Sequence, residues 1–175
     1  MSLLTRILGG TSDRAQLQPL YGAVVAIGRD PAWYRDGQVP DTLNGRFDMI
    51  AAVLALVLLR LEREDAREVR TASALLTELF VDDMDGSLRQ IGIGDLVVGK
   101  HMGRMMGALG GRLTAFRPAV AEPELMRAAV ERNIFHEAAP SADAVGTVAE
   151  RLLEFARGLR DTPVSALLAG EVPRA

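Results

Sequence analysis

Hydrophobic residues recur at spacings of three and four along most of the chain, which is the period of an amphipathic helix, and no segment alternates as a β-strand does. The pattern predicts an all-α fold, a single-domain helical bundle of about six to seven helices over residues 13–170. Residues 1–12 are expected to form a flexible N-terminus and residues 171–175 a C-terminal tail. Helices are expected near residues 13–28, 40–61, 72–91, 95–117, 123–134, 141–159 and 162–170, with a short helical turn at 30–35.

The helix expected at 40–61 is apolar on several faces from Met49 to Leu59, which predicts a central position in the bundle. This apolar run is too short for a membrane span, which needs about 20 residues. The one tryptophan, Trp33, falls in the short turn that precedes it. Two interpretations of Trp33 are open: a lid packed on the core, or an exposed contact for a partner.

A polar, glycine-rich stretch from Phe80 to Lys100 interrupts the apolar pattern. At 100° per residue Asp83 falls within the apolar stripe, so we expect an arginine or a helix terminus to pair with it. Asp82, Asp85 and Arg89 fall on the opposite face, where Asp85 and Arg89 can form an i,i+4 ion pair. Gly92 and Gly94 are expected to end this helix, and Asp95 to cap the next one.

The helix that follows carries a ridge of glycines at i+4 spacing, namely Gly99, Gly103, Gly107 and Gly111. Each glycine inside a helix costs about 0.5–1 kcal/mol relative to alanine, so an aligned set calls for a reason. Either a neighbouring helix of the same domain approaches closely, or the exposed backbone receives a helix of another chain.

The composition excludes some classes of function but does not identify the function. The net charge is only −3 and charges of both signs alternate along the chain, so nothing indicates nucleic-acid binding. The absence of cysteine excludes disulfides and thiol catalysis. The apolar start of the chain is read as a frayed terminus, with an amphipathic membrane contact as the alternative. We expect a cytoplasmic protein, with contact to the inner face of the cell membrane or to the ribosome left open.

The sequence contains no complete motif for catalysis or for binding a metal or cofactor. With Gly86 at position six of a calcium loop, Val81 and Gly92 would occupy ligand positions, so the register fails. His101 and His136 have no metal-binding spacing. An enzyme that uses Asp82, Asp83 or Asp85 would need a deep pocket around them. Another alternative is a helical carrier of haem or lipid, lined by His101 and the methionines at 102, 105 and 106.

Two runs carry a family resemblance: Pro40-Asp-Thr-Leu-Asn-Gly-Arg-Phe-Asp-Met, and the stretch from Phe80 to Asp95. In this order, and each in a helical context, they resemble the ubiquinol-cytochrome c chaperone family from about Leu17 to Arg117. The resemblance implies an all-helical assembly factor for ubiquinol-cytochrome c reductase (complex III) that binds newly synthesised cytochrome b and is not an enzyme. Members in mitochondria carry a targeting sequence, a membrane-associated N-terminal portion and a small partner chaperone. We expect a bacterial-type member, for which the small partner is an open question.

On this interpretation the client docks where the helices on either side of residue 92 meet. The expected floor is Gly99 and Gly103, and the expected corner is Gly92, Gly94 and Asp95. The polar rim is expected to consist of Asp82, Asp85, Arg89 and Lys100. Asp83 is expected to act as a structural brace, together with Arg46 and Phe47 of the first run.

Overall fold

The computed structural model describes residues 13–90, 95–136 and 139–174, with the backbone alone described at 95–98. Its labelled helices are α2 (Gln18–Gly28), α3 (Pro31–Arg35), α4 (Leu43–Leu61), α5 (Arg67–Gln90), α6 (Asp95–Ala119), α7 (Pro123–Ile134), α8 (Ala142–Asp161) and α9 (Val164–Leu168). No strand occurs in these ranges, so the predicted all-α class is confirmed. Six of the helices have eleven residues or more, and α3 and α9 have five each.

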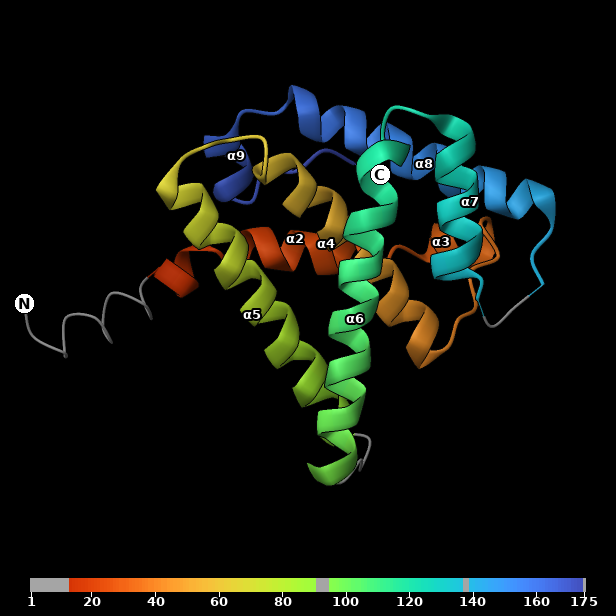
Figure 1. Cartoon of the computed structure of the whole chain (residues 1–175), viewed down its shortest axis with the longest axis horizontal. Helices are drawn as coiled ribbons and strands as arrows, with labels where there is room; N and C mark the ends of the chain where they lie inside the picture. Colours follow the sequence, from red (N-terminus) through yellow and green to blue (C-terminus); the bar gives the residue numbers. More distant parts are fainter. Residues whose placement is uncertain (1–12, 91–94, 137–138, 175) are drawn as a thin grey trace, which may run out of the picture.

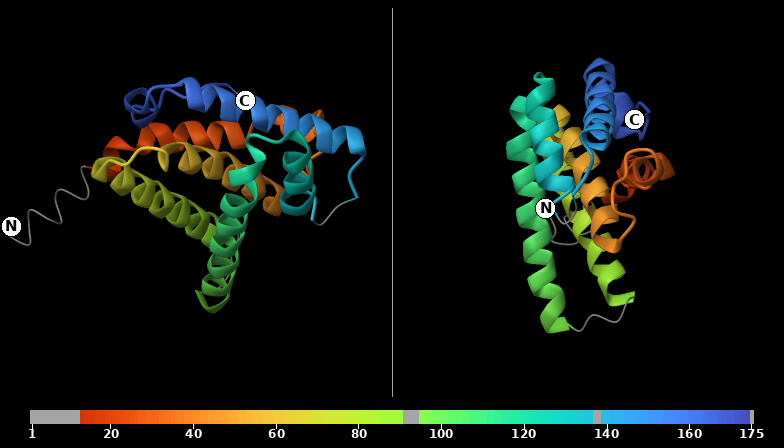
Figure 2. Two further views of the ribbon diagram at one scale, coloured as in Figure 1. Left: turned by 45° about the horizontal axis from the view of Figure 1, so that its top comes forward. Right: turned by 90° about the vertical axis from the view of Figure 1, so that its right-hand side faces the viewer.

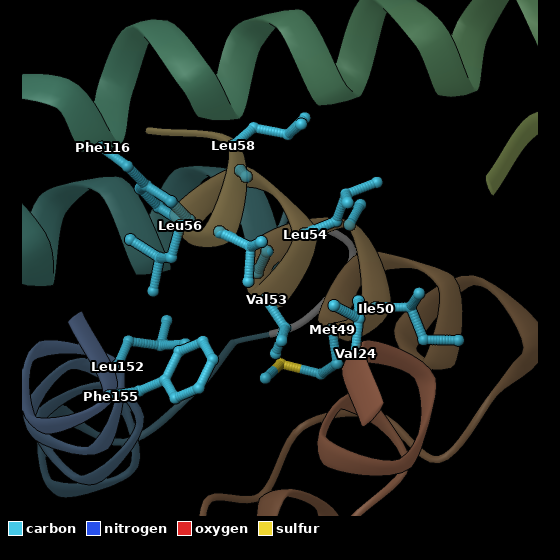
Figure 3. Packing of buried hydrophobic residues seen from close by; sticks show 14 of the residues in the cluster. Val24, Met49, Ile50, Val53, Leu54, Leu56, Leu58, Phe116, Leu152 and Phe155 are labelled. Atoms are coloured by element: carbon cyan, nitrogen blue, oxygen red, sulfur yellow. The ribbon is translucent and has the colours of Figure 1, made fainter. Parts of the chain in front are cut away.

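Helix α4 lies at the centre of the bundle, as its apolar faces predict. It begins after Thr42, whose hydroxyl accepts a hydrogen bond from the backbone N–H of Gly45 at 3.1 Å. Every residue from Met49 to Leu58 is buried. Helices α2, α5, α6, α7 and α8 all pack against α4. Figure 3 shows α4 side chains facing Val24 of α2, Phe116 of α6, and Leu152 and Phe155 of α8.

The short helix α3 closes one side of the core. Asp30 caps it by accepting a hydrogen bond from the Ala32 backbone N–H at 2.9 Å. Trp33 is fully buried, its indole N–H donates to the carbonyl oxygen of Ile27 at 2.7 Å, and the Arg151 guanidinium stacks over its ring. Trp33 is therefore a lid on the core and not an exposed partner contact.

The C-terminal part of α5 and the N-terminal part of α6 project beyond the remaining helices, as Figures 1 and 2 show. The two helices pack against each other, and α6 also packs on α4 and α7. We call this projection, residues 82–90 and 95–103, the arm. No helix in the described ranges combines the length and apolar character that crossing a membrane requires.

Candidate partner-binding site

The arm carries most of the residues predicted to bind a partner. Asp85 and Arg89 form the expected i,i+4 ion pair, with 2.7 Å between Arg89 Nε and Asp85 Oδ2. Asp82, whose side chain is 62% exposed, pairs with Arg14 ahead of α2. Lys100 is exposed on α6. The structure thus places four charged groups at the surface of the arm, although intramolecular ion pairs already engage three of them.

The predicted corner residues lie at the edge of the described part of the chain or outside it. Gly92 and Gly94 lie outside the described residues, so the expected corner between the helices stays a prediction. Helix α6 begins at Asp95, whose side chain also lies outside the described part.

The partner of Asp83 differs from the expected arginine or helix terminus. The hydroxyl of Tyr21 on α2 donates a hydrogen bond of 2.8 Å to Asp83 Oδ2. Tyr21 is buried, and burial raises the pKa of its hydroxyl well above the ordinary value, with the hydrogen bond to Asp83 acting in the same direction. A neutral hydroxyl can satisfy this carboxylate because Asp83 is only half-buried and keeps part of its hydration.

Replacing Tyr21 by phenylalanine is expected to lower the free energy of unfolding by about 1.5–3 kcal/mol, the usual contribution of a hydrogen bond to a charged group. Urea denaturation at neutral pH measures the change. Tyr34→Phe is the matched control, because the Tyr34 hydroxyl donates to a neutral acceptor, the Gly28 carbonyl oxygen, at 2.7 Å. A smaller loss for Tyr21→Phe than for Tyr34→Phe would contradict the role of Asp83.

Arg46 and Phe47, the other two expected braces, act at the start of α4 and not at Asp83. Arg46 Nε lies 2.7 Å from Asp41 Oδ1, and its guanidinium lies over the Tyr34 ring. Phe47 is 6% exposed and belongs to the core. No described contact joins either residue to Asp83, so these residues stabilise two separate parts of the fold.

The glycine ridge faces open space. A Cβ atom built at Gly99, Gly103 or Gly107 would have no described atom within 4 Å beyond its own helix, and at Gly111 it would make only an ordinary contact with Asn133. Close approach of a neighbouring helix within the domain is therefore not the reason for the ridge. The exposed backbone is available to a helix of another chain, which was the alternative interpretation.

The structure brings together a polar cluster that the sequence reasoning missed. Arg112 of α6 is 2% exposed, pairs with Asp48 of α4 at 2.5 Å, and donates a hydrogen bond to the Asn133 carbonyl oxygen. His136 Nδ1 lies 3.7 Å from Asp48 Oδ2. Asp48, His101 and His136 together line a small surface hollow. Burial lowers the pKa of Arg112, while the charge of Asp48 acts in the opposite direction. The sequence did contain a signal for this cluster, because Arg112 lies between Leu109 and Phe116 on the core face of α6, where an arginine needs a buried partner.

The residues expected for a ligand carrier or for an enzyme do not line a cavity of ligand size in the described part of the chain. The hollow beside His101 measures about 190 Å³, below the usual range of roughly 300–1,000 Å³ for ligand pockets, and Met105 is the only one of the three proposed methionines that lines it. A larger cavity of about 400 Å³ is within that range and has charged residues and apolar ones such as Leu75 and Leu168 in its lining, but neither His101 nor the proposed methionines. Asp82, Asp83 and Asp85 line neither cavity. No group of three or more candidate metal ligands occurs in the described part of the chain.

Comparison with known proteins agrees with this architecture. The chain is similar to the crystal structure of the Cbp3 homolog from Brucella abortus, with a TM-score of 0.82 and 27% sequence identity over 100% of this chain and 97% of that one. No curated protein matches the chain. The model of the ubiquinol-cytochrome C chaperone family matches residues 35–175. This chain therefore belongs to the ubiquinol-cytochrome c chaperone family.

Proposed function

We propose that this protein is an assembly chaperone for complex III, that it binds newly synthesised cytochrome b, and that it is not an enzyme. The observation that carries the proposal is the family match over residues 35–175. The similarity to the Cbp3 homolog over the whole chain supports it. Such a protein needs a surface for a client and no catalytic centre.

The open face of α6 is the surface that we propose for the client. Cytochrome b is a membrane protein with apolar helices, and glycines let helix backbones approach closely. Gly99 and Gly103 would form the floor, beside the half-buried Met102 and the exposed Met106. Lys100 neighbours the ridge on α6, and Asp82, Asp85 and Arg89 would extend the polar rim on α5.

Site-specific photo-crosslinking tests this placement. A photoreactive residue at position 85 or 100 is expected to capture newly made cytochrome b in cells whose complex III assembly depends on this protein. Position 35 provides the control, because Arg35 is exposed on α3, away from the arm. Capture from position 35 but from neither arm position would show that the client binds elsewhere.

Gene deletion tests the function independently of the surface. Cytochrome b is expected to fall more than cytochrome c1 or an unrelated membrane enzyme, because a dedicated chaperone protects one client. Equal loss of all three proteins would contradict the assembly role.

We place the protein in the cytoplasm at the inner face of the cell membrane, where a client of this kind is inserted. The purified chain alone tests the need for a small partner chaperone. Protection of cytochrome b by this chain without any partner would show that none is needed.

A further inference from the structure

A shallow groove at the opposite end of α6 from the arm is lined by arginines and apolar side chains. It measures about 200 Å³ and lies between the C-terminal parts of α4 and α8 and the turn after α6. A second hollow of about 290 Å³ shares Leu59, Arg63 and Val120 with it. We call the two together the arginine groove, which is lined by Leu56, Leu59, Arg60, Glu62, Arg63, Arg117, Val120, Ala121, Ala156, Arg157 and Arg160.

The charge of this groove is opposite to that of the whole chain. Five arginines and one glutamate line it, although the net charge of the protein is −3. Some of this charge is neutralised, because Arg60 pairs with Glu64, Arg117 with Glu62 and Arg160 with Asp161. Arg63 and Arg157 are exposed and have no ion-pair partner among the described residues. Two guanidinium groups are thus available to an anion.

Arg60 holds one side of the groove in place. Its side chain is only 12% exposed, and it donates hydrogen bonds to the carbonyl oxygens of Leu159 and Thr162 at 2.9 and 3.2 Å. These bonds join the end of α4 to the end of α8. The mutual position of Arg63 on the α4 side and Arg157 on α8 is therefore set by the fold.

The apolar part of the lining indicates what kind of anion fits. Val120 is 37% exposed at the turn after α6, and Leu59 and Ala156 are half-buried beside it. An arginine fork binds phosphate oxygens bidentately, while its aliphatic stem lies along apolar surface. A phospholipid presents both features, a phosphate above a hydrocarbon. Single-stranded RNA would instead require aromatic side chains for base stacking, and the groove contains none.

We propose that the arginine groove binds the headgroups of anionic phospholipids and thereby holds this domain at a membrane surface. The inference does not depend on the identity of the client. The two surfaces are also separate, because the 14 steps along α6 from Gly103, the last residue of the arm, to Arg117 of the groove span about 21 Å. Changes at one surface are therefore expected to leave the other intact.

Vesicle flotation with the purified full chain tests the proposal. Binding is expected to vesicles of equal parts phosphatidylcholine and phosphatidylglycerol, to weaken with added salt, and to be absent from pure phosphatidylcholine. The double variant Arg63→Glu/Arg157→Glu is expected to bind at least about 25-fold more weakly, since the loss of each arginine near an anionic surface costs roughly fivefold and each new glutamate adds repulsion. Val120→Ser, which changes the apolar lining without adding a charge, is expected to weaken binding as well.

The matched control is Arg35→Glu/Arg132→Glu, which changes the same number of charges at exposed positions outside the groove. Equal loss of binding in the control and in the groove variant would overturn the proposal, as would equal binding to neutral and anionic vesicles. The proposal would also be overturned if inorganic phosphate or a short RNA abolished vesicle binding when its phosphate concentration equals that of the anionic lipid. Crosslinking of cytochrome b from position 100, measured in the same variants, shows separately whether the proposed client surface works.

Discussion

Replacing Arg112 by methionine is expected to lower the free energy of unfolding by about 3–5 kcal/mol, which is the usual effect of removing one partner from a buried ion pair. The Asp48 side chain is 15% exposed and would lose its guanidinium partner. The carbonyl oxygen of Asn133 would lose its hydrogen bond from Arg112 as well. Urea denaturation at neutral pH, monitored by the far-ultraviolet circular dichroism of the helices, measures the difference.

Helix α6 offers a control in Arg117→Met. Arg117 also pairs with a carboxylate of another segment at 2.5 Å, but the side chains of Arg117 and Glu62 are 60% and 40% exposed. Water screens that pair, so the expected loss is below about 1 kcal/mol. The double variant Asp48→Leu/Arg112→Met is expected to regain most of the stability, because both charges of the buried pair are replaced by apolar side chains. A similar loss for Arg112→Met and Arg117→Met would show that burial does not determine the effect.

The helical architecture could be predicted because each helix carries its own local signals. The three-and-four spacing, Asp30 as an N-cap and the apolar faces of α4 are all readable within one turn or two. The start of α4 was expected at residue 40, but the helix begins at Leu43, after the N-cap Thr42. Contacts between distant segments are different. Tyr21 and Asp83 are 62 residues apart and Asp48 and Arg112 are 64 apart, and a single sequence does not show which polar group meets which.

The glycines also show that a local sequence pattern does not reveal which surfaces pack together. Their spacing on α6 was evident in the sequence, but whether the ridge packs against a helix depends on how α6 is placed on α4 and α7. Close approaches that require a glycine occur at other positions, among them Gly28, where a Cβ atom would lie 2.8 Å from the Ile50 Cα atom. Gly28 ends α2, where a helix end was expected, but nothing in the sequence shows that the backbone of Ile50 packs against it.

Changing Gly99, Gly103 and Gly107 together to alanine is therefore expected to stabilise the protein, by about 1.5–3 kcal/mol in total. Alanine is favoured over glycine inside a helix by about 0.5–1 kcal/mol at each site, and no described neighbour opposes the added methyl groups. Thermal and urea denaturation of the triple variant measure the gain. Gly28→Ala is the control with the opposite sign, with an expected loss of about 1–3 kcal/mol because the backbone of Ile50 must move.

The same triple variant connects the stability of α6 to the proposed function. If a client helix lies on the exposed backbone of the ridge, three methyl groups hold it away, and crosslinking of cytochrome b from position 100 decreases although the chaperone itself is more stable. Gain of stability with loss of client capture would explain why the chain keeps glycines that weaken its own helix. Gain of stability with unchanged capture would exclude the ridge as the floor of the client site and leave the charged rim of the arm as the surface to test. Loss of stability would mean that the ridge is packed after all.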